Sequence, residues 1–324
     1  MLRGRGCQVP LLAALALLVA VWLALGPWYG SGPLEKDTPF LVPDGASLSS
    51  VSAKLEKEGA VSSASSFRLR ARILGGGSAI KAGEFLLPKG ASPAKILSII
   101  QGDEVLRRFV TIPEGMPSIM VAERLNAHPN LAGHVEAPPE GSVLPDTYEI
   151  ARGESRQAVL QRMQAAMSRA LAEEWERRGP NTVVKTPAEA LVLASIVEKE
   201  TGKPSERKVV AGLYSNRLRQ GIMLQADPTI IYPITRGKPL GRRIRQSEIA
   251  AINDYNTYSM LGLPKGPITN PGRASIAAVL NPAQTDALYM VADGSGGHAF
   301  AATLDQHNAN VEKWFAIRRS RGEM

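Results

Sequence analysis

Residues 191–201 read LVLASIVEKET, an apolar helical run that ends in two carboxylates. A carboxylate at the end of such a run lies against apolar neighbours and at the negative end of the helix dipole, where anions are disfavoured. Both effects raise the pKa of a carboxyl group. A carboxyl group that is still protonated near neutral pH can protonate the leaving oxygen of a glycosidic bond. The run therefore predicts a general acid at the end of a helix.

Glu198 and Glu200 lie two residues apart, which places them roughly 200° apart around a helix. They cannot act as a paired acid and base on one substrate, so one of them is the candidate acid and the other a support or a surface charge. Glu200 continues the more apolar face, which carries Leu193, Ile196 and Val197. This difference slightly favours Glu200 over Glu198 as the candidate general acid. The pattern alone leaves open that both glutamates are solvated and neutralised by neighbouring lysines.

The bounds of this helix follow from its flanking residues. Thr186 is the expected N-cap, Pro187 takes the first helical position, and Glu189 completes a capping box. Gly202 and Pro204 end the helix. Glu198 and Glu200 are therefore expected in its last turn.

The amino terminus reads as a membrane anchor. Arg3 and Arg5 precede residues 9–29, an apolar run long enough to span a bilayer as a helix. Aromatic residues typical of a membrane interface lie near the far end of the run: Trp22, Trp28 and Tyr29. We expect residues 1–8 in the cytoplasm, a transmembrane helix at residues 9–29, and the rest of the chain outside. The alternative is a signal peptide cleaved near residues 24–26.

The composition argues against several kinds of active site and ligand. Cys7 is the only cysteine, so the exported part has neither a disulfide nor a catalytic thiolate. The four histidines form no cluster at metal-ligand spacing, so no metal and no cofactor are expected. No Gly-x-Ser-x-Gly motif supports a serine hydrolase. The net charge of +8 suits an anionic polymer or anionic lipid headgroups. An aromatic content of 5% and the lack of a concentrated basic helix argue against nucleic acid.

A short repeat organises the first part of the chain after a linker at residues 30–38. Residues 41–45, 86–90 and 111–115 read LVPDG, LLPKG and TIPEG, and each precedes a helical pattern. Each copy predicts a strand, a turn and a helix, because proline ends strand pairing and glycine tolerates a positive φ. A further helix is expected at residues 63–73. The order strand, helix, helix, strand resembles a LysM domain, a module that binds amino-sugar polymers, although a structural stalk would also fit.

The second part of the chain is dense in Asn, Gln, Thr and Tyr among Gly and Pro. Such side chains can read sugar hydroxyl and acetamido groups, but they are also ordinary turn residues. A long amphipathic helix is expected at residues 155–178, a strand–turn–strand unit at residues 288–300, and a terminal helix at residues 304–319.

Several of these segments together match one family. They are ASIVEKET at 194–201, NRL at 216–218, LQADPT at 224–229, YNTY at 255–258, GLP at 262–264 and VADG at 291–294, with PDTY at 145–148. The chain resembles the endolytic murein transglycosylases, the YceG-like family. The resemblance covers residue 41 to the carboxyl terminus and is most specific in the second half.

The resemblance implies a lyase that cleaves the β-1,4 bond between N-acetylmuramic acid and N-acetylglucosamine in nascent peptidoglycan strands. The product carries a 1,6-anhydro sugar, and strand elongation ends. The second glutamate of the family's Glu-Lys-Glu motif is catalytic, which corresponds to Glu200. The candidate substrate-binding residues are Glu198, Gln225, Asp227, Thr229, Tyr255, Asn256, Tyr258 and Asn270.

The resulting expectation is an α+β protein on a single transmembrane helix in the bacterial inner membrane. A LysM-like module at residues 39–104 would hold glycan strands, and a helix-rich catalytic domain at residues 105–324 would cleave them outside the cytoplasm. Peptidoglycan synthases in the same membrane are implied partners. Two alternatives stay open. One is a muramidase that uses Glu206 or Asp227 as a second carboxylate, and the other is a non-catalytic peptidoglycan-binding scaffold.

Overall fold

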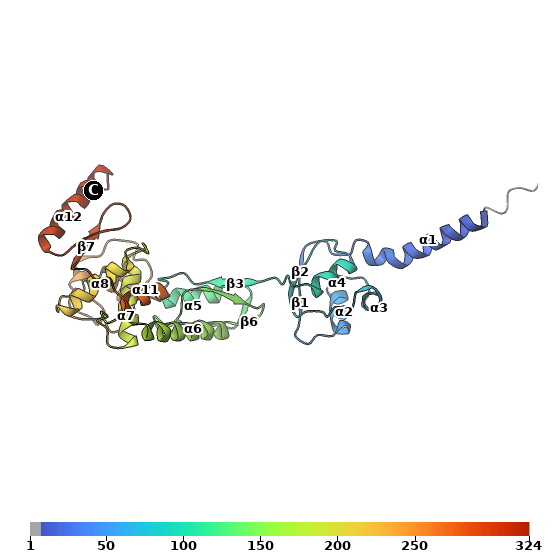
Figure 1. Ribbon diagram of the computed structural model, residues 1–324, viewed down its shortest axis with the longest axis horizontal. Helices are drawn as coiled ribbons and strands as arrows, with labels where there is room; N and C mark the ends of the chain where they lie inside the picture. The colour runs from blue at the N-terminus through green and yellow to red at the C-terminus, as the bar shows by residue number, and fades with distance from the viewer. Residues whose placement is uncertain (1–7, 324) are drawn as a thin grey trace, which may run out of the picture. The chain divides into compact units, whose positions relative to one another are not determined.

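The computed structural model describes residues 8–323, in which one compact unit ends at Arg107 and a second begins at Arg108 (Figure 1). Both units combine helices with two-stranded sheets. The mixture of helices and strands in the predicted fold class is therefore confirmed.

Unit 1 is built on an antiparallel strand pair covered by helices. Its elements are α1 (Gln8–Tyr29), β1 (Thr38–Val42), α2 (Leu48–Lys57), α3 (Ala64–Leu74), β2 (Gly83–Leu87) and α4 (Pro93–Gln101). Phe40 of β1 pairs with Phe85 of β2, and both rings are fully buried. Leu55 and Ile96 bring α2 and α4 into the same core. The predicted strand, helix, helix, strand order is present here.

The predicted transmembrane helix at residues 9–29 is wrong. Helix α1 forms there, but no helix in the described part of the chain is long and apolar enough to cross a membrane. Its carboxyl end packs on unit 1 instead: Trp28 is 2% exposed, and its ring centroid lies 5.7 Å from that of Phe67. Of the three expected interfacial aromatics, Trp28 is therefore a core residue, whereas Trp22 and Tyr29 are exposed. The predicted inner-membrane anchorage and contact with the bilayer rested on this helix and have no support in the described residues. The predicted cytoplasmic tail lies largely outside those residues.

The three repeated turns take one backbone conformation. Gly45, Gly90 and Gly115 have φ values of 70°, 65° and 72°, in the left-handed region that favours glycine. A helix follows each turn, and Ser92 caps the second of these helices by accepting a hydrogen bond from Lys95 N. The Pro-x-Gly turns predicted from the sequence therefore form, with glycine in the backbone conformation that it favours.

Unit 2 begins with a strand pair backed by two helices. Its first elements are β3 (Arg108–Thr111), α5 (Ser118–Ala127), β4 (Leu131–Ala132), β5 (Thr147–Ile150), β6 (Glu154–Ser155) and α6 (Arg156–Glu176). Strands β3 and β5 are antiparallel, whereas β4 and β6 are parallel. Figure 1 shows α5 and α6 beside the β3–β5 pair, and Val121, Val159 and Met163 of these helices are buried in one cluster with Val110 of β3.

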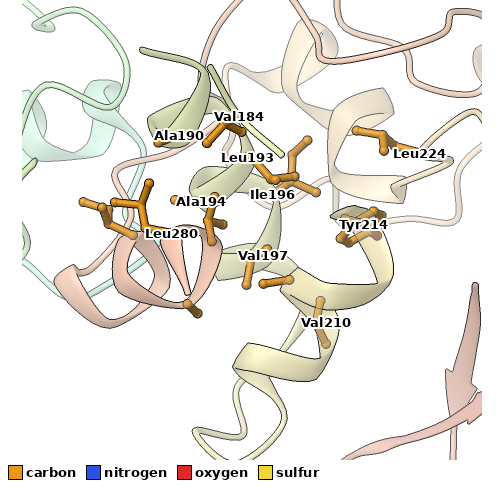
Figure 2. Packing of buried hydrophobic residues seen from close by; sticks show 14 of the residues in the cluster. Val184, Ala190, Leu193, Ala194, Ile196, Val197, Val210, Tyr214, Leu224 and Leu280 are labelled. Atoms are coloured by element: carbon orange, nitrogen blue, oxygen red, sulfur yellow. The ribbon is translucent and has the colours of Figure 1, made fainter. Parts of the chain in front are cut away.

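The rest of unit 2 surrounds a buried helix. Its elements are α7 (Pro187–Glu200), α8 (Arg207–Arg219), α9 (Asp227–Thr235), α10 (Gln246–Ile249), α11 (Arg273–Leu280), β7 (Tyr289–Ala292), β8 (His298–Ala301) and α12 (Leu304–Ser320). Helices α8, α11 and α6 pack against α7 or its neighbours. Figure 2 shows Leu193, Ile196 and Val197 of α7 among apolar side chains of these elements. Helix α7 is buried on nearly every side, which explains why its sequence is apolar over almost its whole length.

The amino-terminal cap of α7 follows the prediction with one difference. Thr186 Oγ1 accepts a hydrogen bond from Glu189 N at 3.1 Å, and Pro187 takes the first helical position. The Glu189 carboxylate accepts from Lys185 N, at 2.6 Å, instead of the N–H of Thr186. The helix ends at Glu200, as the flanking residues predicted.

Ser195→Ala should lower the free energy of unfolding of unit 2. Ser195 is fully buried in α7, donates to Val192 O and accepts from Ile268 N at 3.0 Å. Removing the hydroxyl leaves the buried Ile268 N–H without a partner, which costs about 1–3 kcal/mol. Hydrogen exchange of α7 amides at increasing urea concentration measures the change.

Ser168→Ala is the matched control, because Ser168 is also in a helix but is exposed and bonds only to Gln164 O. This control should leave the unfolding free energy within about 0.5 kcal/mol of that of the original chain. Equal effects of the two substitutions would contradict the role given to Ser195.

Candidate active site

A cavity of about 240 Å³ lies at the carboxyl end of α7. Its walls come from α7, α8, the start of α9, the loop at residues 255–258 and the β7–β8 hairpin. The lining residues are Glu200, Leu213, Tyr214, Arg217, Leu224, Gln225, Asp227, Tyr258, Met290, Val291, Ala292 and His298. Segments that are far apart in the sequence therefore converge on Glu200.

Glu200 combines a buried oxygen with a raised pKa. Its Oε1 atom is buried and has no hydrogen-bond partner among the described residues. Burial, and then the nearby charge of Asp227, raise the pKa of Glu200 from 4.5 to about 7, although Tyr214 and Arg217 act in the opposite direction. The position at the carboxyl end of α7 disfavours the anion further. Glu200 therefore holds a proton over a wider pH range than an ordinary glutamate, and one of its oxygens lacks a hydrogen-bond partner within the described residues.

Asp227 and Tyr258 form a hydrogen-bonded pair in the same cavity. Tyr258 Oη donates to Asp227 Oδ1 at 2.6 Å. Burial and this hydrogen bond raise the pKa of Tyr258 well above its ordinary value, so the phenol remains a donor. Asp227 lies in the first turn of α9, where the helix dipole favours a negative charge. The pair therefore places a second carboxylate in the cavity that Glu200 lines.

Arg217 fixes one wall of the cavity. It is 7% exposed, its Nε donates to Leu288 O at 2.7 Å, and its Nη1 donates to Met223 O and Leu224 O at 3.0 Å each. Nη1 also lies 3.3 Å from Oε1 of Gln225, a residue held at a φ of 52°. A single guanidinium thus joins α8 to the loop before α9 and to the residue that precedes β7.

Sequence reasoning missed the parts played here by Arg217 and Tyr214. Tyr214 is 2% exposed and belongs to the apolar cluster around α7 (Figure 2). Its pKa is raised well above the ordinary value by burial and by Glu200. The only sequence signal was the Asn-Arg-Leu segment on α8, which drew attention to Arg217 without assigning it a task.

Glu198 lies on a different face of α7, as the helical spacing predicted. Its Oε2 accepts hydrogen bonds from Gly272 N at 2.9 Å and from Ser275 Oγ at 2.7 Å, and Arg207 lies 4.0 Å from Oε1. The Glu198 carboxylate therefore joins α7 to the start of α11, and it does not line the cavity.

The other candidate substrate-binding residues divide into two groups. Gln225, Asp227 and Tyr258 line the cavity with Glu200. Thr229, Tyr255, Asn256 and Asn270 do not. Thr229 Oγ1 lies 2.9 Å from Thr257 Oγ1 inside the protein, and Tyr255 packs on Tyr232 with ring centroids 4.8 Å apart.

The two buried asparagines make hydrogen bonds within the protein. Asn256 is fully buried, and its Nδ2 donates to Ile249 O at 2.9 Å and to Ala251 O at 2.6 Å. Asn270 is also fully buried, donates to Met116 O at 2.9 Å and accepts from Val143 N at 3.0 Å. These contacts occupy the amides that sequence reasoning assigned to a sugar.

Glu206, the other candidate for a second carboxylate, anchors the β7–β8 hairpin. Its Oε1 accepts from His298 N at 3.1 Å, and its Oε2 lies 2.8 Å from His298 Nδ1. Lys203 binds Ser295 in the same turn at 2.8 Å. Glu206 does not line the cavity, so Asp227 is the one of the two that shares the cavity with Glu200.

Comparison with known proteins identifies the family of the chain. Residues 40–313 match the model of the YceG-like family, and the chain belongs to this family.

Three relatives illustrate the similarity. The endolytic murein transglycosylase of Bacillus subtilis is 25% identical, over 89% of this chain and 89% of the relative. The endolytic murein transglycosylase of Streptococcus pneumoniae strain D39 is 29% identical and matches 83% of this chain, which spans 57% of that relative. The crystal structure of a YceG-like protein from Listeria monocytogenes is 26% identical, with a TM-score of 0.54, over 85% of this chain and 98% of that one.

Glu200→Gln should raise the free energy of unfolding of unit 2 at pH 8 and leave it nearly unchanged at pH 4. The folded-state pKa of about 7 lies above the ordinary 4.5, so stability is lost as the pH rises from 4.5 to 7. The loss is at most about 1.4 kcal/mol for each unit of pKa difference. Glutamine has the same shape and no charge, so it escapes this loss. Urea unfolding of both chains across this pH range measures the effect, and parallel pH dependences would contradict the raised pKa.

Proposed function

We propose that the chain is a lytic transglycosylase that cleaves the β-1,4 bond between N-acetylmuramic acid and N-acetylglucosamine in nascent peptidoglycan strands. The observation that carries the proposal is the Glu200 carboxyl group, with a pKa of about 7 and a buried oxygen without a partner, at a cavity that carries a second carboxylate. A general acid for glycoside cleavage needs such a proton near neutral pH.

In the proposed reaction Glu200 acts twice. Its proton passes to the glycosidic oxygen as the bond to C1 of the muramic acid breaks, and positive charge develops on the sugar ring. The resulting carboxylate then takes the proton of the C6 hydroxyl group, and O6 bonds to C1. The product is a 1,6-anhydro sugar, no water is consumed, and Glu200 is protonated again.

The neighbouring residues support this cycle electrostatically. Asp227, which raises the pKa of Glu200, is negatively charged and can stabilise positive charge on the ring. Tyr258 keeps Asp227 oriented through their 2.6 Å hydrogen bond. Gln225 and Asp227 are exposed and are the proposed sugar contacts, together with Tyr258. Thr229, Asn256 and Asn270 make hydrogen bonds within the protein and would hold their own segments in place.

The relatives support the substrate class, since those of Bacillus subtilis and Streptococcus pneumoniae are named endolytic murein transglycosylases. Murein lies outside the cytoplasm, so we propose that this chain acts there and ends strand elongation by cutting within the strand. Unit 1, with its strand, helix, helix, strand order, would hold the glycan as a LysM-like module.

Hydrolysis is the second candidate, and one observation favours it. Asp227 lines the same cavity as Glu200 and could activate a water molecule on the opposite side of the sugar. The mass of the product distinguishes the two reactions, because hydrolysis adds one water that the transglycosylase reaction does not.

The full chain should convert peptidoglycan strands into products whose muramic acid ends are lighter by one water than reducing ends. Glu200→Gln should reduce the rate by at least about 100-fold, because a general acid contributes on the order of 10²–10⁴-fold. Mass spectrometry of the digests measures both. Glu198→Gln is the matched control, since Glu198 lies on the same helix outside the cavity, and it should still yield the anhydro product. Ordinary reducing ends would replace the proposal by hydrolysis, and binding without cleavage would replace it by a scaffold.

The pH dependence of cleavage should report Glu200. Because the acid must be protonated, kcat/KM should fall as the pH rises through about 7. Asp227 raises the pKa of Glu200, so Asp227→Asn should move this fall to lower pH. Asp254→Asn, an exposed partner of Lys265 outside the cavity, is the control and should leave the profile in place. If Asp227→Asn leaves the pH profile of kcat/KM unchanged, the fall at high pH does not report the pKa of Glu200.

A further inference from the structure

Unit 2 contains a second cavity, larger and more apolar than the first. Its volume is about 470 Å³, within the range of ligand pockets. Met116 and Met120 from the turn and helix α5, Ile231 from α9, and Leu240 and Ile268 from loops form much of its wall. The backbone of Gly237 lies so close to Pro117 that a Cβ atom at residue 237 would be 2.7 Å from Pro117 Cβ. The backbone itself thus shapes this cavity.

The two cavities share their dividing elements. Lys199 lines the apolar cavity and Glu200 the catalytic one, and Pro228 lines the apolar cavity while Asp227 lines the other. Consecutive Cα atoms are about 3.8 Å apart, so the end of α7 and the start of α9 separate the two spaces by single residues. The two cavities are therefore bordered by neighbouring residues of the same two helices.

The mouth of the apolar cavity is basic. Lys199 is exposed and forms no ion pair with any other residue in the described chain. The adjoining loop adds Arg236 and Arg243, both exposed and likewise without an ion pair to a described residue. The acidic groups nearby are already paired: Glu114 of the lining contacts Arg207 at 3.3 Å, and Glu123 binds Lys238 of the same lining. The uncompensated charge is positive, which favours an anionic ligand.

We propose that this cavity binds the stem peptide of the muramic acid whose glycosidic bond lies at Glu200, an inference that rests on the proposed function. The stem peptide is attached to the same sugar ring that is cleaved, through its lactyl group. It begins with a small apolar residue and continues with residues that carry carboxylates. Its methyl groups suit the methionine and isoleucine wall, and its carboxylates suit Lys199. The site therefore reads the peptide as well as the glycan.

The test compares peptide-bearing strands with the same strands after an amidase has removed their peptides. The full chain should cleave the peptide-bearing strands with a kcat/KM at least about tenfold higher, a ratio that corresponds to about 1.4 kcal/mol. Lys199→Ala, at an exposed position, and Met120→Trp, which fills the cavity, should each bring this ratio towards one by slowing cleavage of the peptide-bearing strands alone. Lys313→Ala, an exposed lysine on α12, is the control and should keep the ratio.

Binding separates this proposal from the proposed function. Glu200→Gln should bind peptide-bearing strands more tightly than stripped strands, and adding Lys199→Ala should remove the difference. If the unsubstituted chain cleaves neither substrate but this difference in binding remains, the proposed reaction is wrong and the peptide site stands. Equal kcat/KM for both substrates with equal binding would overturn the peptide site while leaving the reaction intact. Equal losses on both substrates in the two cavity variants would also overturn it and would indicate a lipid or structural role for the cavity.

Discussion

The structure depends on the burial of helix α7, which is enclosed as far as Val197 and ends in a carboxyl group with one buried oxygen. From Ala190 to Val197 the helix is enclosed by α6, α8 and α11, so its side chains hold the unit together (Figure 2). At Glu200, an ionisable group meets the apolar core and the negative end of the helix. Water and cations cannot compensate its charge fully there, and the pKa rises. One constraint, a buried helix that ends in a carboxyl group, thus supports both the fold and the proposed acid.

Polar side chains around this helix fall into two groups, according to whether their hydrogen-bonding atoms have partners within the protein. Glu198, Arg217, Asn256 and Asn270 bond to backbone groups of the protein and hold loops in place. Glu200 differs from them, because its buried Oε1 has no such partner. Buried polar groups are nearly always paired, so an exception marks a place where a ligand can complete the bonding. The contrast between Glu198 and Glu200, two residues apart on one helix, shows this division most directly.

Local patterns predicted much of the fold, because their causes are local. The cap at Thr186, the end of α7 and the glycine turns follow from backbone preferences of single residues. The fate of an amide in a polar loop is not local: Asn256 reads equally well as a sugar contact or as an internal donor until the surrounding carbonyls are known. The apolar run at residues 9–29 misled for a similar reason, since composition does not reveal that Trp28 packs on Phe67. Arg217 was overlooked because its hydrogen bonds to the carbonyl oxygens of Met223, Leu224 and Leu288 depend on how these loops fold around α8.

The central claim is that Glu200 keeps its proton near neutral pH. The most direct test is a titration of the glutamate side-chain carboxyl carbons by ¹³C nuclear magnetic resonance, with the Glu200 signal assigned by its loss in Glu200→Gln. The account predicts a midpoint near 7 for this carboxyl group, as burial and Asp227 require. A midpoint near 4.5, the ordinary value for glutamate, would show that the end of α7 does not protect the proton and would contradict the account.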